Sequence, residues 1–161
     1  MAEAAVVNAS PLIYLARGGC FDLLQVASAN VVVPTAVDGE IRQRGSRDPT
    51  VAAIDQASRV SVVSDPLVPS SIHVWDLGRG ESAVLAWALA RPGTEAVVDD
   101  LAARRCAATL GINFRGTLGL CLAAKRKGII PAARPLLQRL RQAGMYLSDQ
   151  VMNDALALVQ E

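Results

Sequence analysis

The sequence predicts a three-layer α/β/α sandwich around a mostly parallel sheet, and three observations lead to this fold class. Short runs of apolar residues, rich in valine, alternate with longer helix-forming segments along the chain. The apolar runs are continuous, which is typical of parallel strands that are buried on both faces. Glycine or proline marks many of the junctions between the two kinds of segment. Together these patterns favour an architecture in which helices cover both faces of one sheet.

The bulk properties of the chain narrow its class. Its 161 residues fit a single domain over residues 1–161 with a sizeable core. A hydrophobic content of 52% excludes a disordered chain, and a net charge of +1 means that any polyanion must be bound by local clusters. The three cysteines form no CxxC pair, which favours free thiols in a reducing compartment. Without a signal peptide or a membrane-spanning run, we expect a cytoplasmic protein with no membrane partner.

The first half of the chain predicts three strands separated by helices. Strands are expected over residues 5–7, 30–33 and 60–63. Helices are expected over residues 12–17, 21–27, 34–44 and 51–59. Ser10 and Pro11 resemble the cap and first turn of the first of these helices, and Asp48 with Pro49 resembles the start of the last.

The second half continues the alternation after a loop over residues 64–71. Strands or extended segments are expected over residues 72–75, 96–98 and 112–114. Helices are expected over residues 81–90, 101–110, 117–127 and 131–143, and from Ser148 to the C-terminus. The glycines at 78 and 80 predict a tight turn into the helix that begins at Glu81. No internal repeat or linker interrupts the pattern, which supports one domain.

Side chains that carry oxygen recur where this architecture binds ligands. Asn8 follows the first strand, and Asp99 and Asp100 follow a later one, so parallel strands would bring them to the same edge of the sheet. Glu40 lies on the helix after the second strand, and Glu81 opens a helix behind a glycine turn. Carboxylates gathered in one crevice repel each other and lose hydration unless a cation lies between them. With a single histidine and scattered cysteines, the oxygen ligands favour Mg²⁺ or Mn²⁺, ions that can activate water at a phosphodiester.

Five sequence blocks, in order over nearly the whole chain, carry a family resemblance. They are VVNASPLI at 6–13, VVP with VDGEI at 32–41, GESAVLA at 80–86, DDLAARR at 99–105 with GTLGL at 116–120, and AKRKG at 124–128. These blocks resemble the PIN-domain ribonucleases, in particular the compact branch related to type II toxin–antitoxin toxins. The resemblance implies a metal-dependent nuclease that hydrolyses single-stranded RNA. More narrowly, it implies that the protein is a toxin with an antitoxin partner. It also implies that the protein forms a homodimer.

The resemblance assigns roles to particular residues. The catalytic and metal-binding quartet of the family would fall on Asn8, Glu40, Glu81 and either Asp99 or Asp100. The choice between the two aspartates stays open, and the other one would cap the following helix. The first position is usually aspartate, whereas the Asn8 amide can ligate Mg²⁺ but brings no charge. Ser10 would support the site by bonding to a metal-bound water, and Thr117 is a further supporting residue.

Two alternatives to an active ribonuclease remain open. Asn8 motivates the first, a PIN-like binding or regulatory module with weakened or lost catalysis. The second is a dinucleotide-binding domain, because residues 78–83 match GxGxxA and Asp99 follows about 20 residues on. Against the second alternative, Glu81 would place negative charge where a pyrophosphate needs the positive end of a helix.

Contacts to RNA are expected at local basic clusters. One cluster is Arg104 and Arg105, another is Lys125, Arg126 and Lys127, and a third is Arg42, Arg44 and Arg47. If the acids bind a metal ion, Arg104, Lys125 and Arg126 are the cations expected to hold the RNA backbone. Aromatic residues form only 4% of the chain, so the sequence does not favour a surface on which bases stack.

Overall fold

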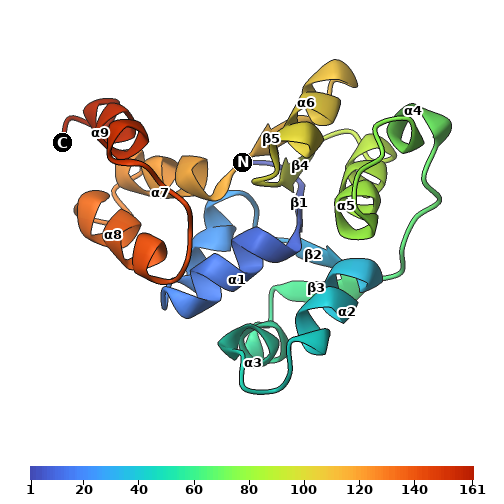
Figure 1. Ribbon diagram of the computed structural model, residues 1–161, viewed down its shortest axis with the longest axis horizontal. Helices are drawn as coiled ribbons and strands as arrows, with labels where there is room; N and C mark the ends of the chain where they lie inside the picture. The colour runs from blue at the N-terminus through green and yellow to red at the C-terminus, as the bar shows by residue number, and fades with distance from the viewer.

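The sheet has five parallel strands in the order β3-β2-β1-β4-β5, with β1 at its centre (Figure 1). The computed structural model describes residues 1–161. The strands are β1 (Ala4–Val7), β2 (Val31–Pro34), β3 (Val60–Val63), β4 (Thr94–Val97) and β5 (Asn113–Arg115). Because every pair is parallel, all five carboxyl ends lie at one edge of the sheet, where the sequence predicted the ligand site.

The helices cover this sheet and pack against one another. They are α1 (Ala9–Arg17), α2 (Thr35–Gln43), α3 (Pro49–Gln56), α4 (Ser70–His73), α5 (Arg79–Leu89), α6 (Leu101–Thr109), α7 (Thr117–Arg126), α8 (Arg134–Gln142) and α9 (Asp149–Ala157), with a 3-10 helix η1 (Phe21–Val26). Helix α1 packs against α2, α3, η1, α7 and α8, whereas α5 packs over β1, β2 and β4 and against α6. The predicted three-layer α/β/α sandwich is confirmed. None of the helices has the length and apolar character needed to cross a bilayer.

Burial follows the position of each strand in the sheet. The central strand β1 contributes Ala5, Val6 and Val7, all fully buried, as a continuous apolar run on a two-sided strand requires. Strand β3 lies at the edge of the sheet, and its Val62 is 43% exposed. The apolar run at residues 60–63 predicted a strand correctly, but the pattern alone did not distinguish an edge from a centre.

The register of β1 against β4 places the two key loops side by side. Val7 pairs with Val97, and the Asn8 backbone N–H donates to the Val97 carbonyl at 3.0 Å. Asn8 therefore leaves the sheet at the level where β4 ends and the loop carrying Asp99 begins. This follows directly from parallel pairing of neighbouring strands.

Two local predictions were wrong. Residues 72–75, expected as a strand, belong to the short helix α4 and the turn after it. Only Ile72 of this segment is fully buried, while Val74 is 79% exposed. The segment therefore contacts the core through one side chain, and it pairs with no strand. Ser10 does not cap α1, because the helix begins at Ala9 and Asn8 is the residue at the N-cap position. The predicted caps at Asp48 and Ser148 are confirmed, since each accepts a backbone N–H from the first turn of its helix.

Candidate functional site

Asn8, Glu40 and Glu81, which we call the α5 cluster, come from three elements and meet at the start of α5. The Asn8 side-chain amide donates through Nδ2 to Glu81 Oε1 at 3.1 Å. A Cβ atom added to Gly80 would lie 2.7 Å from Glu40 Oε1 and 3.1 Å from Asn8 Oδ1. Both oxygens therefore lie against the bare Cα of Gly80. The structure brings together three of the five predicted ligands.

Gly80 contributes to the candidate site through a close approach that the sequence, which indicated only a glycine turn here, did not predict. Helices α2 and α5 pack against each other, and Gly80 is buried in the first turn of α5. With no side chain there, the Glu40 carboxylate can reach the end of β1. The sequence did contain one indication: Gly80 directly precedes the acidic residue at the start of the helix. A glycine in such a position often allows another group to approach the backbone closely.

The α5 cluster contains more negative charge than its neighbours balance. Burial of the carboxylate raises the pKa of Glu40, and the charge of Glu81 raises it further, while the Gly80 backbone and Arg44 act in the opposite direction. Glu40 is exposed along most of its side chain, so it is the packing of its carboxylate at Gly80 that matters. Arg79, at the start of α5, pairs with Asp65 at 3.7 Å.

Asn8 Oδ1 is the most informative atom of the cluster. It is buried and has no hydrogen-bond donor. Buried polar atoms are nearly always satisfied, so an unpaired oxygen beside two carboxylates calls for an explanation. A hard divalent cation would satisfy this oxygen and reduce the repulsion between Glu40 and Glu81. The donor set therefore fits Mg²⁺ or Mn²⁺.

Asp99 and Thr117, which we call the α7 pair, form a second and separate arrangement. Asp99 Oδ1 accepts the Thr117 backbone N–H at 2.7 Å, and Asp99 Oδ2 accepts the Thr117 hydroxyl at 2.7 Å. Thr117 is fully buried as the first residue of α7. This bonding gives the predicted supporting residue Thr117 a defined partner.

Asp99 does not join the α5 cluster in one acidic group. No set of three histidine, cysteine, aspartate or glutamate side chains lies close enough to hold an ion. Asp99 lines a cavity of about 620 Å³, whereas Glu40 lines a different and smaller one of about 300 Å³ beside Asp65 and Arg79. The predicted quartet is thus divided between two neighbouring places at the carboxyl edge of the sheet.

The structure separates the two adjacent aspartates. Asp100 is the N-cap of α6, where its Oδ2 accepts the Ala103 backbone N–H at 2.9 Å. Asp99 points to Thr117 and the cavity instead. The expectation that one aspartate caps the helix is confirmed for Asp100, and Asp99 stays the predicted ligand.

A family model described as a PIN domain matches residues 4–161. The chain belongs to the PIN-domain family. The match includes all five candidate ligands and confirms the resemblance carried by the sequence blocks. PIN domains are generally nucleases, so family membership supports a nuclease, that is, a hydrolase of phosphodiester bonds. A comparison with curated proteins gives no match.

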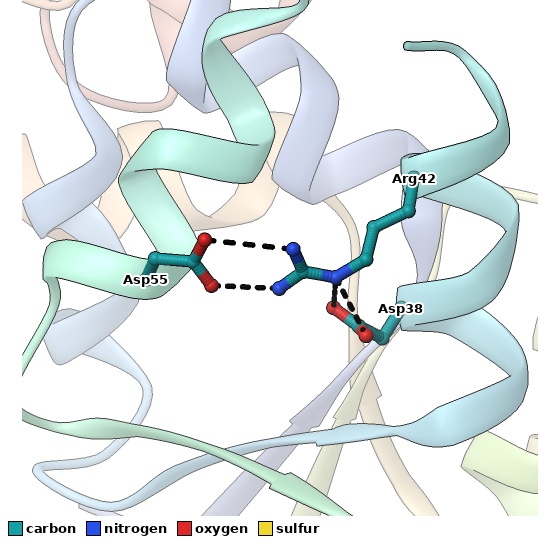
Figure 2. A network of polar contacts seen from close by, with 3 residues as sticks. All are labelled: Asp38, Arg42 and Asp55. Atoms are coloured by element: carbon teal, nitrogen blue, oxygen red, sulfur yellow. Dashed lines mark hydrogen bonds and ion pairs between the residues drawn. The ribbon is translucent and has the colours of Figure 1, made fainter. Parts of the chain in front are cut away.

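The predicted basic clusters of this PIN domain differ in how many of their charges are free. Figure 2 shows Arg42 between two aspartates, with Nε 2.9 Å from Asp38 Oδ2 and Nη2 2.6 Å from Asp55 Oδ1. These carboxylates raise the pKa of Arg42, and the ion pairs join α2 to α3. Arg42 therefore serves the packing of the helix that carries Glu40, and its charge is not free to bind a polyanion.

The other predicted RNA-binding residues also differ in whether their charges are free. Lys125 donates to the Pro131 carbonyl at 2.6 Å and lies 4.0 Å from Glu161, so it holds the C-terminal residue. Arg104 and Arg126 form no ion pair, and each lines a cavity beside β5 and α7. Of the three predicted cations, only Arg104 and Arg126 have free charges.

The GxGxxA match lacks the structural context of a dinucleotide site. The predicted glycine turn is not formed, because Arg79 and Gly80 already belong to α5, and the segment before α5 is the short helix α4 and a loop, with no strand. The carboxylates of Glu40 and Glu81 lie at the N-terminal end of α5. A pyrophosphate would meet negative charge where such sites present backbone N–H groups.

Proposed function

We propose that this PIN domain is a metal-dependent ribonuclease that hydrolyses single-stranded RNA. The observation that carries the proposal is the buried, unpaired Asn8 Oδ1 beside two carboxylates that repel each other. Asn8, Glu40 and Glu81 would hold Mg²⁺ or Mn²⁺, with Asp99 contributing from the α7 pair. When bound, such an ion supplies charge stabilisation at a phosphodiester and a more acidic water.

The residues of the chain prepare the site for this role. The Asn8 amide donates to Glu81 and so fixes the orientation of both side chains. Gly80 leaves the space that the Glu40 carboxylate occupies. Thr117 holds both oxygens of Asp99, which limits that carboxylate to one orientation. A site held in this way needs little rearrangement before it acts.

The narrower form of the proposal is a toxin of a toxin–antitoxin pair, with an antitoxin protein and a second copy of the chain as partners in the cytoplasm. The order of the five sequence blocks supports it, as they resemble the compact toxin-related branch. The three cysteines are free, in agreement with a reducing compartment.

A second candidate is a PIN module that binds or regulates without cleaving. The Asn8–Glu81 hydrogen bond favours it, because a neutral amide here gives Glu81 a donor that aspartate could not give. An amide also attracts a cation less strongly than a carboxylate does. In this candidate the site is stable without an ion.

A cleavage assay on the full chain distinguishes the two candidates. We expect the protein to cut 5′-labelled single-stranded RNA with Mn²⁺, leaving 5′-phosphate ends, and to lose this activity in EDTA or as Glu81→Gln. Asp22→Asn, at an exposed acid on η1, is the matched control and should remain active. Activity only in Asn8→Asp would support the second candidate. If wild type and Asn8→Asp are both inactive, the chain is not a ribonuclease.

A further inference from the structure

A cavity of about 620 Å³ opens beside Asp99. Residues of α1, α6, β5, α7 and the segment before α9 surround it. The chain has only two tryptophans, two tyrosines and two phenylalanines, yet Tyr14, Phe114 and Tyr146 all line this cavity. The fold gathers half of a scarce residue class in one place, although the sequence alone did not favour a surface on which bases stack. The volume lies in the range of small-molecule sites.

The side chains at this cavity offer flat surfaces and positive charge. The Arg104 guanidinium lies over the Phe114 ring, 5.7 Å from its centre. The Tyr146 side chain is 91% exposed at the rim, although aromatic rings are usually well covered. Leu118 and Leu122 add apolar surface. Such a combination suits a planar, uncharged ring system bound by stacking.

A second cavity of about 420 Å³ continues the first and has a different character. Arg115, Arg126 and Lys127 line it, and none of its five lining residues is acidic. Arg115 and Gly119 belong to both cavities. A Cβ atom on Gly119 would lie 2.7 Å from Arg115 Cγ, so the arginine crosses the bare glycine at the junction. Glu95 holds the guanidinium of Arg115 at 3.1 Å, so the charges of this cavity that are not in an ion pair are those of Arg126 and Lys127.

We infer that these two cavities form one nucleotide subsite for single-stranded RNA. One base stacks on Tyr146 and on the Phe114–Arg104 pair, and the neighbouring phosphate lies in the cavity of Arg115, Arg126 and Lys127. A flat apolar region followed directly by a cationic one matches the alternation of base and phosphate along a single strand. A double helix keeps its bases stacked inside and could not present one in this way. The inference rests on the proposed function, because Asp99 belongs to the first cavity.

Binding without cleavage tests the base half of this subsite. The probe is a fluorescein-labelled oligoribonucleotide of about six nucleotides, an ordinary site size for such proteins, measured by anisotropy with the full chain in EDTA. Tyr146→Ala should weaken binding about fivefold or more, as loss of one stacked base does, and Tyr146→Phe should retain wild-type binding. Leu67→Ala, which removes another apolar side chain at a 97% exposed position, should change nothing.

The salt dependence of binding tests the phosphate half. Arg126→Gln should weaken binding and reduce the slope of log K against log salt by about 0.7, the value for one phosphate on a single strand. Arg59→Gln, at an exposed arginine directly before β3 that lines neither cavity, should give the wild-type slope.

The outcomes separate this inference from the proposed ribonuclease. Oligonucleotide binding that is the same in wild type, Tyr146→Ala and Arg126→Gln would overturn the subsite. It would also be overturned if Tyr146→Ala left oligonucleotide binding intact but abolished self-association in sedimentation, because the groove would then be a protein interface. Variant-sensitive binding without cleavage in Mn²⁺ supports the subsite and contradicts the ribonuclease. Cleavage in Mn²⁺ together with binding that the variants do not change supports the ribonuclease and contradicts the subsite.

Discussion

The α5 cluster and the α7 pair lie at the same edge of the sheet, but they differ in how well their polar oxygens are supplied with hydrogen-bond donors. In the α7 pair, Thr117 gives both oxygens of Asp99 a donor. In the α5 cluster, Glu40 and Glu81 repel each other and Asn8 Oδ1 has no donor at all. The α7 pair satisfies its polar atoms within the chain, whereas the α5 cluster leaves one buried oxygen without a partner.

This difference predicts where loss of a carboxylate should mainly affect the stability of the fold and where it should mainly affect ligand binding. A satisfied carboxylate at a helix start stabilises the folded chain, so its removal should cost stability. A crowded carboxylate destabilises the chain, so its removal should cost ligand binding instead. Variants of the two places should therefore affect different measurements.

The largest expected effect is on cleavage, from closing the space at Gly80. In Gly80→Ala the new Cβ would lie 2.7 Å from Glu40 Oε1, and the flexible glutamate must move out of the α5 cluster. Small misplacements of this kind cost about 100-fold in rate, while folding is little affected because alanine suits a helix. Initial cleavage rates in Mn²⁺, with thermal unfolding as the stability measurement, check this.

Gly116→Ala is the matched change at the α7 pair. Its Cβ would lie 3.0 Å from Asp99 Oδ1, next to the bonds to Thr117. We expect this variant to lower the unfolding temperature more than Gly80→Ala does. If Gly80→Ala cleaves at the wild-type rate, Glu40 has no role at the site.

A large effect on stability is expected at Thr117. Thr117→Val keeps the shape of a fully buried side chain but removes the hydroxyl that bonds Asp99 Oδ2 at 2.7 Å. Loss of a hydrogen bond to a charged group should lower the free energy of unfolding by about 1.5–3 kcal/mol. Urea unfolding measures it, with Thr117→Ser as the variant that keeps the hydroxyl. Equal stability of the valine and serine variants would contradict the account of the α7 pair.

Asn8→Asp should change metal affinity more than it changes the fold. The substitution replaces the donor to Glu81 with a third carboxylate, so the metal-free chain should unfold at a lower temperature. Mn²⁺ should bind about tenfold more tightly, as expected for an added unit charge a few ångströms from the ion. Calorimetric titration with Mn²⁺ measures this, and Asn153→Asp on the exposed face of α9 is the control. Unchanged affinity would show that residue 8 does not contact the ion.

The sequence predicted those features that depend on neighbours along the chain. The caps at Asp48 and Ser148 bond backbone N–H groups two or three residues ahead, so local residue types were sufficient. For α6 the sequence predicted that Asp99 or Asp100 would be the cap, and the structure decides for Asp100. The apolar runs identified all five strands of the sheet, because a parallel sheet needs continuous burial. The additional strand expected over 72–75 failed for lack of a partner, which no local pattern reveals.

The sequence did not predict features that depend on packing between distant elements. The Asn8–Glu81 bond spans 73 positions and forms only because α2, α5 and β1 converge at Gly80. Tyr14, Phe114 and Tyr146 are far apart in the chain, and nothing in the sequence indicated that they line one cavity. The residue types of the site could be named from the sequence, but not the division of its acids into two places.

The smallest expected effect is a pH dependence of stability with opposite signs at two glutamates. Burial of the carboxylate and the nearby Glu81 raise the pKa of Glu40 above its ordinary value of 4.5. The folded chain therefore disfavours ionised Glu40, and wild type loses stability relative to Glu40→Gln as the pH rises through this raised pKa. At a pH below 4.5 both side chains are neutral and the difference should vanish.

Glu161 supplies the opposite case within the same chain. Its carboxylate accepts the backbone N–H groups of Ala133 at 2.6 Å and Arg134 at 3.2 Å, which lower its pKa. Wild type should therefore be more stable than Glu161→Gln at neutral pH, and should lose this advantage as the pH falls through the lowered pKa. Urea unfolding of both variants from about pH 3 to 8 should give slopes of opposite sign, with the Glu161→Gln change confined to the acidic end of the range. Added Mn²⁺ should reverse the Glu40→Gln difference near neutral pH, because the ion binds the ionised carboxylate, and should leave the Glu161→Gln difference unchanged.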